Sequence, residues 1–142
     1  MIEVVVDAQS LKRSGSGSIT GRILLRGPVG SFPEERWSDF PVVILTWWIE
    51  GLNNIVAGSG RTFEGMFMDG PFSFIVHRGE GKSGRIAWGK RGQEATVGIL
   101  DIAALLGSAV AAGKVVAASC RAQGLSSSDL ERLEEALARV AP

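Results

Sequence analysis

The fold is decided by residues 62–78, which read TFEGMFMDGPFSFIVHR. Two apolar and aromatic runs flank Asp69-Gly70, a dipeptide that tolerates the positive φ angles of a tight hairpin turn. With a two-residue turn, Gly65 lies opposite Phe74, and the aromatic side chains share one face of the strand pair. Pro71 cannot donate a hydrogen bond to the ladder, so the register beside the turn stays open. The stretch predicts an antiparallel hairpin with one apolar face.

The rest of the chain carries strand and helix signals on both sides of this hairpin. Apolar and β-branched runs predict strands at residues 2–7, 18–26, 85–91 and 94–100. Helical periodicity predicts helices from about residue 38 to the glycines at 58 and 60, from 102 to 123, and from 128 to 140. The order ββαββββαα predicts an α+β fold in which residues 1–142 form a single domain. In this fold, one mainly antiparallel sheet packs against one central helix and two C-terminal helices.

The central helix carries a broad apolar stripe. At about 100° per residue, the buried positions are expected to be Val42, Ile44, Leu45, Trp48, Ile49, Leu52, Ile55 and Val56. Ser38 or Asp39 is expected to accept the free amide hydrogens of the first turn. Trp47 and Val43 fall on the opposite side of the helix, together with Glu50. One side of the helix therefore belongs to the core, and the tryptophan on the other side needs an explanation.

Two further helices are expected at the C-terminus. Asp101 is expected to cap the first of them, in which Gly107 and Gly113 each cost about 1 kcal/mol relative to Ala and can divide the helix. Cys120 belongs to its apolar stripe, where a cysteine acts as a small hydrophobe. The capping-box pattern of residues 128–131 predicts the start of the last helix.

Composition and charge exclude several classes of function. The 142 residues contain 15 Lys and Arg against 15 Asp and Glu, so the net charge gives no reason to expect binding to nucleic acid or to a membrane. One cysteine cannot form an internal disulfide, which favours a reducing, cytoplasmic compartment. The uncharged apolar runs at 40–49 and 102–113 span 10 and 12 residues, fewer than the roughly 18 of a membrane-spanning helix. We therefore expect no membrane segment.

A small enzyme or ligand-binding domain is the alternative function. Its candidate residues are Glu64 and His77, which the expected register places on one face of the hairpin, diagonally across the strand pair. Such a pair can orient an imidazole as a general base. The simpler interpretation is a solvated ion pair. Because His77 is the only histidine and no metal-ligand spacing is visible, we expect no metal site and no cofactor.

A basic, glycine-rich segment follows the hairpin. Residues 79–84 read GEGKSG, but a strand-like segment follows where a phosphate loop needs a helix, so a hairpin connection is expected. Lys82, Arg85 and Lys90 form a candidate patch for an anion or an acidic partner. The other interpretation of these residues is protection of strand edges. Only Trp88 interleaves with the charges, so nucleic acid is not an expected partner.

Trp47 is the strongest candidate for a binding residue. An indole opposite the core stripe is either covered by another segment of the chain or available to a partner, because tryptophan is enriched among binding hot spots. Val43 shares its side of the helix, and Trp37 and Trp88 carry the same ambiguity. The expected partner is another protein or a second copy of the chain, as in a homodimer.

Three segments carry a resemblance to known proteins. Residues 37–41 (WSDFP), 47–48 (WW) and 67–71 (FMDGP) resemble small uncharacterised bacterial proteins and the immunity proteins of polymorphic toxin systems. Immunity proteins share a role more than a motif, so the resemblance assigns no functional residue. It implies a small cytoplasmic protein that binds and blocks a toxin domain. We therefore expect a non-enzymatic protein-binding module, either an immunity-type inhibitor of a bacterial toxin or a homo-oligomer.

Overall fold

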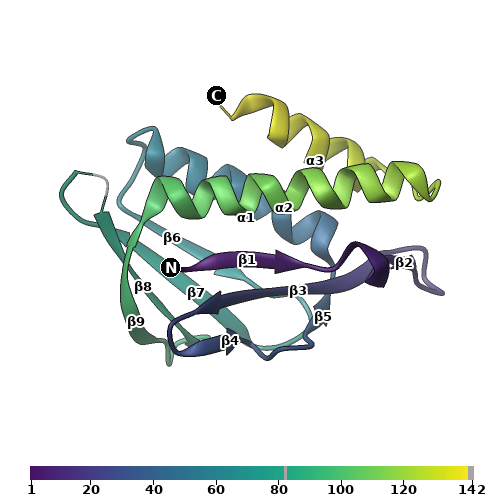
Figure 1. Cartoon of the computed structure of the whole chain (residues 1–142). Helices are drawn as coiled ribbons and strands as arrows, with labels where there is room; N and C mark the ends of the chain where they lie inside the picture. The colour runs from purple at the N-terminus through teal and green to yellow at the C-terminus, as the bar shows by residue number, and fades with distance from the viewer. Residues whose placement is uncertain (82, 141–142) are drawn as a thin grey trace.

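The computed structural model describes residues 1–81 and 83–140, and within them it has three helices and two antiparallel sheets (Figure 1). The elements are β1 (Glu3–Val6), a 3-10 turn (Ala8–Ser10), β2 (Lys12–Arg13), β3 (Ile19–Gly27), β4 (Gly30–Phe32), β5 (Ser38–Asp39), α1 (Pro41–Val56), β6 (Thr62–Met66), β7 (Phe72–Arg78), β8 (Ser83–Lys90), β9 (Ala95–Asp101), α2 (Ile102–Ala122) and α3 (Ser128–Arg139). The α+β class and the order of the main elements are confirmed. The strands divide between two sheets where the sequence predicted one, because α1 separates two groups of strands that each pair internally.

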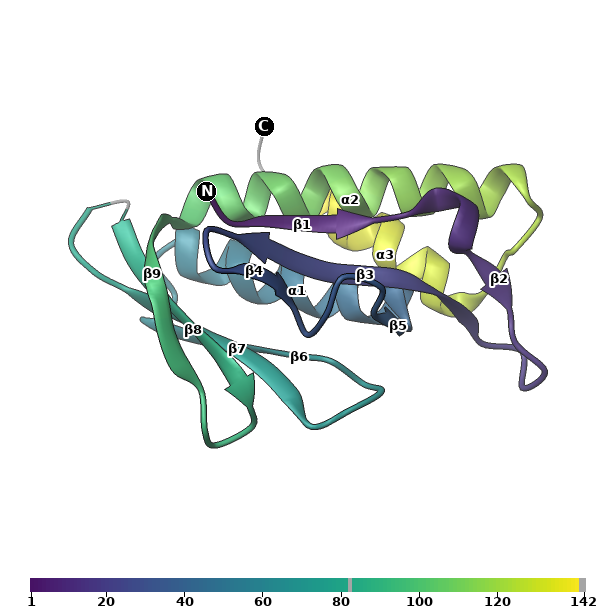
Figure 2. The ribbon, with the colours of Figure 1, turned by 60° about the horizontal axis from the view of Figure 1, so that its bottom comes forward.

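The two sheets meet at a cluster of aromatic rings. β3 is the centre of the first sheet and pairs with β1, β2, β4 and β5, whereas the second sheet is the meander β6-β7-β8-β9 (Figure 2). Phe32 at the end of β4 packs edge-on against Phe67 and Phe72 and stacks on Trp88. One hydrophobic core therefore includes residues of both sheets and of the three helices.

The predicted hairpin forms β6 and β7 in the expected register. Gly65 pairs with Phe74, and Phe67 donates its backbone N–H to Phe72 O at 3.1 Å. A Cβ on Gly65 would lie 2.2 Å from the Phe74 ring, so only glycine leaves room for this ring to cross the strand pair. The apolar face of the hairpin, with Val76, is turned into the core.

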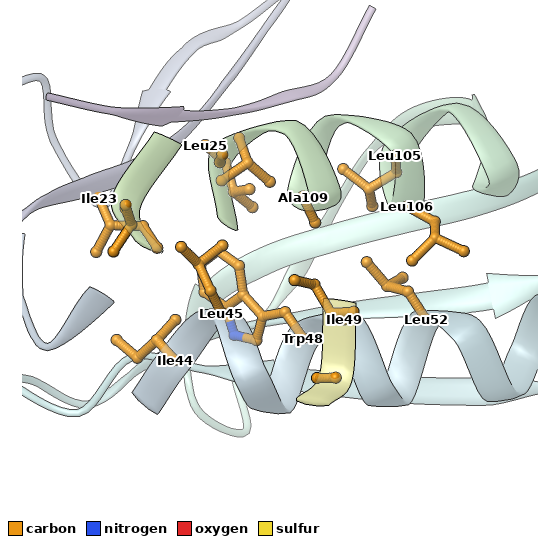
Figure 3. Close-up of a cluster of buried hydrophobic side chains, with 14 of the residues drawn as sticks. Ile23, Leu25, Ile44, Leu45, Trp48, Ile49, Leu52, Leu105, Leu106 and Ala109 are labelled. Carbon is orange, nitrogen blue, oxygen red and sulfur yellow. The ribbon is translucent and has the colours of Figure 1, made fainter. Parts of the chain in front are cut away.

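α1 is the central helix and packs against both sheets, α2 and α3. Figure 3 shows Leu45, Ile49 and Leu52 of α1 directed toward α2. The predicted stripe is buried except for Val56, which is exposed because it is the last residue of the helix. Thr46 is also buried, and its hydroxyl donates to the Val42 carbonyl oxygen at 2.9 Å within the helix.

Two predicted helix caps are wrong. α1 has Phe40 as its N-cap, with no side-chain cap bond among the described residues, and Asp39 accepts from the Phe40 amide but from no later amide of the first turn. In α3 the cap is Ser127, one residue before the predicted position, and its hydroxyl accepts from the Leu130 amide at 3.1 Å. Asp101 caps α2 as expected.

α2 runs along β1 without the division that its glycines suggested (Figure 2). Gly113 packs closely between α1 and α3, because a Cβ there would lie 3.0 Å from Ile49 and 3.1 Å from Leu137. Cys120 is buried, as expected. By length and composition α2 is apolar enough to cross a membrane, with a mean hydropathy of 1.7, and 44% of the window concerned is buried within this fold.

Candidate protein-binding surface

Trp47 lies on the outward side of α1 and is 43% exposed. The sequence left open whether another segment covers this indole, and the structure leaves almost half of the residue accessible. Its neighbours one turn away on the helix surface are Val43 and Gly51. These neighbours define where Trp47 lies relative to the second sheet.

Trp47 lies alongside the middle of β6. Gly51 faces the ring of Phe63 near the start of that strand, and a Cβ on this glycine would lie 2.1 Å from the ring. Val43 and Met68, which belongs to the turn after β6, line one surface pocket. Because residues four apart on a helix are neighbours, Trp47 lies between Val43 and Gly51 along the helix, level with the middle of β6.

We call Trp47, Val43 and Met68 the Trp47 surface. Met68 is 46% exposed, whereas Met66 is 37% exposed on the face of the sheet that it shares with Glu64 and that turns away from α1. Trp48 holds Met66 beside α1, since its indole N–H donates to the Met66 backbone oxygen at 3.2 Å. We did not expect Met68 at a binding surface. The available signal was an apolar side chain directly before the predicted Asp69-Gly70 turn.

Asp39 ties the turn after β6 to the start of α1. Its carboxylate, 2% exposed, accepts hydrogen bonds from the backbone amides of Phe40, Met68 and Asp69 at 2.8, 3.2 and 3.1 Å. The Trp37 indole donates a fourth at 2.9 Å. These donors satisfy a buried carboxylate, and they bring together the WSDFP and FMDGP segments.

No family model, curated protein or solved structure matches the chain.

The other two tryptophan candidates pack against rings of their own chain. Trp37 makes edge-on contacts with Phe67 and Phe72 at centroid distances of 6.3 and 5.4 Å. Trp88 stacks on Phe32 at 5.1 Å, with an interplanar angle of 2°. Both tryptophans are half-buried. Aromatic packing therefore accounts for them, and they are not part of the Trp47 surface.

The candidate anion patch is not assembled by the residues described. Arg85 and Lys90 lie five residues apart on β8, roughly 16 Å along the strand. They also belong to opposite faces of the sheet, because Arg85 pairs with the exposed His77 and Lys90 pairs with Phe72 of the aromatic cluster. Lys82 lies outside the described residues. Arg85 and Lys90 therefore do not bind one small anion together.

Glu64 and His77 share the outward face of the hairpin, as the register predicted, but they do not form a site. Glu64 pairs with Ile75 and His77 with Thr62, and both candidates are exposed. In the part of the chain that the structure describes, no hydrogen bond or ion pair joins them, and no three potential metal ligands cluster. A general base needs a partner within hydrogen-bond reach, so this geometry does not support the enzymatic alternative.

Proposed function

We propose that this chain is a non-enzymatic protein-binding module that docks a partner protein on the Trp47 surface. The observation that carries the proposal is the 43% exposure of Trp47 on the side of α1 that also carries Val43, which lines a surface pocket with the exposed Met68. Tryptophan supplies a large, rigid contact area at binding hot spots. Methionine side chains adapt to the shape of a partner. Such a cluster of large apolar side chains on a protein surface is typical of an interaction site.

The support beneath this surface favours a rigid docking site. Trp47 and Val43 project from a 16-residue helix, and the hydrogen bonds to Asp39 hold the turn that carries Met68. A preorganised surface loses little conformational entropy when it binds, which increases affinity. An immunity-type inhibitor that blocks a toxin domain is a binder of this kind, and we propose it as the biological role.

The test compares the affinity of the native partner for two variants of the chain, Trp47→Ala and a matched control. The partner is isolated from the native host with the tagged chain, identified by mass spectrometry, and then purified so that its dissociation constant can be measured. The matched control is Val115→Ala, because Val115 is 47% exposed on α2, a helix that forms no part of the Trp47 surface. Circular dichroism confirms that both variants are folded.

We expect Trp47→Ala to weaken binding at least about 30-fold, as for a hot-spot residue, and Val115→Ala to leave it unchanged. Binding by Trp47→Ala within about threefold of the original affinity would contradict the proposal. A chain that is monomeric and retains no host protein would contradict it as well. A homodimer that dissociates in Trp47→Ala would instead assign the surface to self-association.

A further inference from the structure

The second sheet ends at β6, and the backbone of this strand has an unpaired edge (Figure 2). Hydrogen bonds at both ends of the ladder fix which residues face β7. Phe67 donates its N–H to Phe72 O at 3.1 Å, and Arg78 donates its N–H to Arg61 O at 2.7 Å. Because hydrogen-bonded pairs alternate along an antiparallel ladder, Glu64 in the middle of β6 directs its backbone N–H and C=O away from β7.

One of these outward groups is already used, and the others are not. The Met66 oxygen accepts the Trp48 indole N–H at 3.2 Å. Within residues 1–81 and 83–140, the Met66 N–H and both backbone groups of Glu64 have no hydrogen-bond partner. An edge of this kind is a template for pairing with another strand.

Two other edges of the molecule are protected against such pairing. At β1, the Val4 N–H donates to the Ser108 hydroxyl of α2 at 2.8 Å, so a helix covers that edge. At β9, the register shifts between the partners of Ile86 and Ala87, and an irregularity of this kind interrupts strand addition. β6 reads TFEGM, without proline, and its ladder with β7 is regular.

We propose that β6 receives an extended segment of the partner protein as an additional antiparallel strand. This inference rests on the proposed function and specifies the shape of the segment that docks. A strand added at β6 extends the sheet along the side of α1 that carries Trp47, so its inward side chains pack on the Trp47 surface. The exposure of Trp47 then has a structural reason, because the sheet ends before it reaches this indole.

The acidic residues in the middle of β6 and in the turn after it favour a basic segment there, whereas Arg61 precedes the strand. Glu64 is the one charged residue of β6, and Asp69 follows in the turn. Both are exposed, and neither takes part in an ion pair of the residues described. Residues directly opposite one another share a face of the sheet, so Lys or Arg opposite Glu64 is favoured. Two copies paired about Glu64 would oppose like charges, which favours a different protein over a second copy.

The test uses a synthetic peptide of about nine residues that alternates valine and lysine. In the proposed antiparallel pairing, the lysines share the face of Glu64 and direct their amides toward β6, whereas the valines face Trp47 and direct their amides away. Two modified peptides therefore form a matched pair, one N-methylated at the lysine amides and the other at the valine amides. A fourth peptide replaces lysine with glutamate. Fluorescence anisotropy measures the four affinities for the complete chain.

We expect N-methylation at the lysines to weaken binding at least about tenfold, the effect of losing hydrogen bonds, and N-methylation at the valines to leave it unchanged. The glutamate peptide should bind more weakly than the lysine peptide, and Glu64→Lys should reverse that order. The Glu64 and Met66 amides should exchange with deuterium more slowly when the unmodified peptide is bound.

Three results would overturn the inference. They are absence of binding by the unmodified peptide, equal binding by the two N-methylated peptides, and a dimer of the free chain in which the Glu64 amide is already protected. The inference fails separately from the proposed function. If Trp47→Ala abolishes binding of the native partner while both N-methylated peptides bind equally, the Trp47 surface stands and strand addition is wrong. If Trp47→Ala leaves the native partner bound, the proposed function itself is wrong.

Discussion

The indole nitrogen of Trp48 donates a hydrogen bond to the backbone oxygen of Met66 at 3.2 Å, and this bond fixes α1 to the edge of the second sheet. The Trp48 ring also makes edge-on contacts with Phe67 and Phe74, at 5.1 and 4.9 Å. Trp47, the preceding residue, projects from the other side of the helix. Two adjacent tryptophans therefore have different roles, one in the core and one at the surface.

This difference predicts unequal effects of two alanine substitutions. We expect Trp48→Ala to lower the free energy of unfolding by about 3–5 kcal/mol, the cost of truncating a buried large aromatic side chain. Trp47→Ala should cost about 1 kcal/mol or less, because Trp47 is 43% exposed and does not belong to the hydrophobic core cluster. Urea unfolding followed by circular dichroism measures both values. Equal costs would mean that another part of the chain covers Trp47 in solution.

Two helical glycines give a second matched pair. A Cβ on Gly51 would lie 2.1 Å from the Phe63 ring, so we expect Gly51→Ala to destabilise the protein by about 1–3 kcal/mol through overpacking. A Cβ on Gly107 would meet no heavy atom of the described residues within 4 Å. Gly107→Ala should therefore stabilise the protein by about 0.5–1 kcal/mol, the gain from helix propensity. Thermal melts of the two variants should shift in opposite directions.

The elements and the hairpin register could be predicted because short-range patterns determine them. Asp69-Gly70 defines the turn, and the alternation on either side of it then determines that Gly65 meets Phe74. The spacing of apolar residues likewise identified the buried side of α1. The opposite orientations of Arg85 and Lys90 could also have been predicted from the sequence, because residues five apart on a strand face opposite sides of the sheet.

The division into two sheets and the Trp47 surface could not be predicted in the same way. Both depend on contacts between residues that are far apart in the chain. Aspartate is a common helix-capping residue. A local pattern cannot reveal that the amides of Met68 and Asp69, 29 and 30 residues later, bind the Asp39 carboxylate instead. The exposure of Trp47 depends on where β6 ends relative to α1, which no spacing within either element specifies.

The position of Asp39 leads to a third prediction. Asp39→Ala leaves the Met68 and Asp69 amides, the Phe40 amide and the Trp37 indole without their acceptor, so we expect a loss of about 3 kcal/mol or more. Asp39→Asn should cost less, because its side-chain oxygen can still accept while its NH2 group opposes the remaining donors.

The control for this prediction is Ser38→Ala. Ser38 was the other predicted cap and is exposed, so its removal should change the free energy of unfolding by no more than about 0.5 kcal/mol. Hydrogen exchange of the Met68 and Asp69 amides should accelerate in Asp39→Ala and stay unchanged in Ser38→Ala. The cap hypothesis would be restored if Ser38→Ala were as destabilising as Asp39→Ala.

A fourth prediction concerns the pH dependence of stability. Burial raises the pKa of the Cys120 thiol, and the nearby Arg121 opposes this effect only in part. Above about pH 8.5, the unfolded chain loses the thiol proton while the folded chain retains it, so the free energy of unfolding falls as pH rises through this range. Because the sequence contains no tyrosine, no phenol titrates there.

Cys120→Ala removes the titrating thiol, so the stability of this variant should decline less between pH 7.5 and 9.5 than that of the unmodified chain. Urea unfolding at the two pH values measures the difference, and parallel declines would show that the thiol ionises equally in both states.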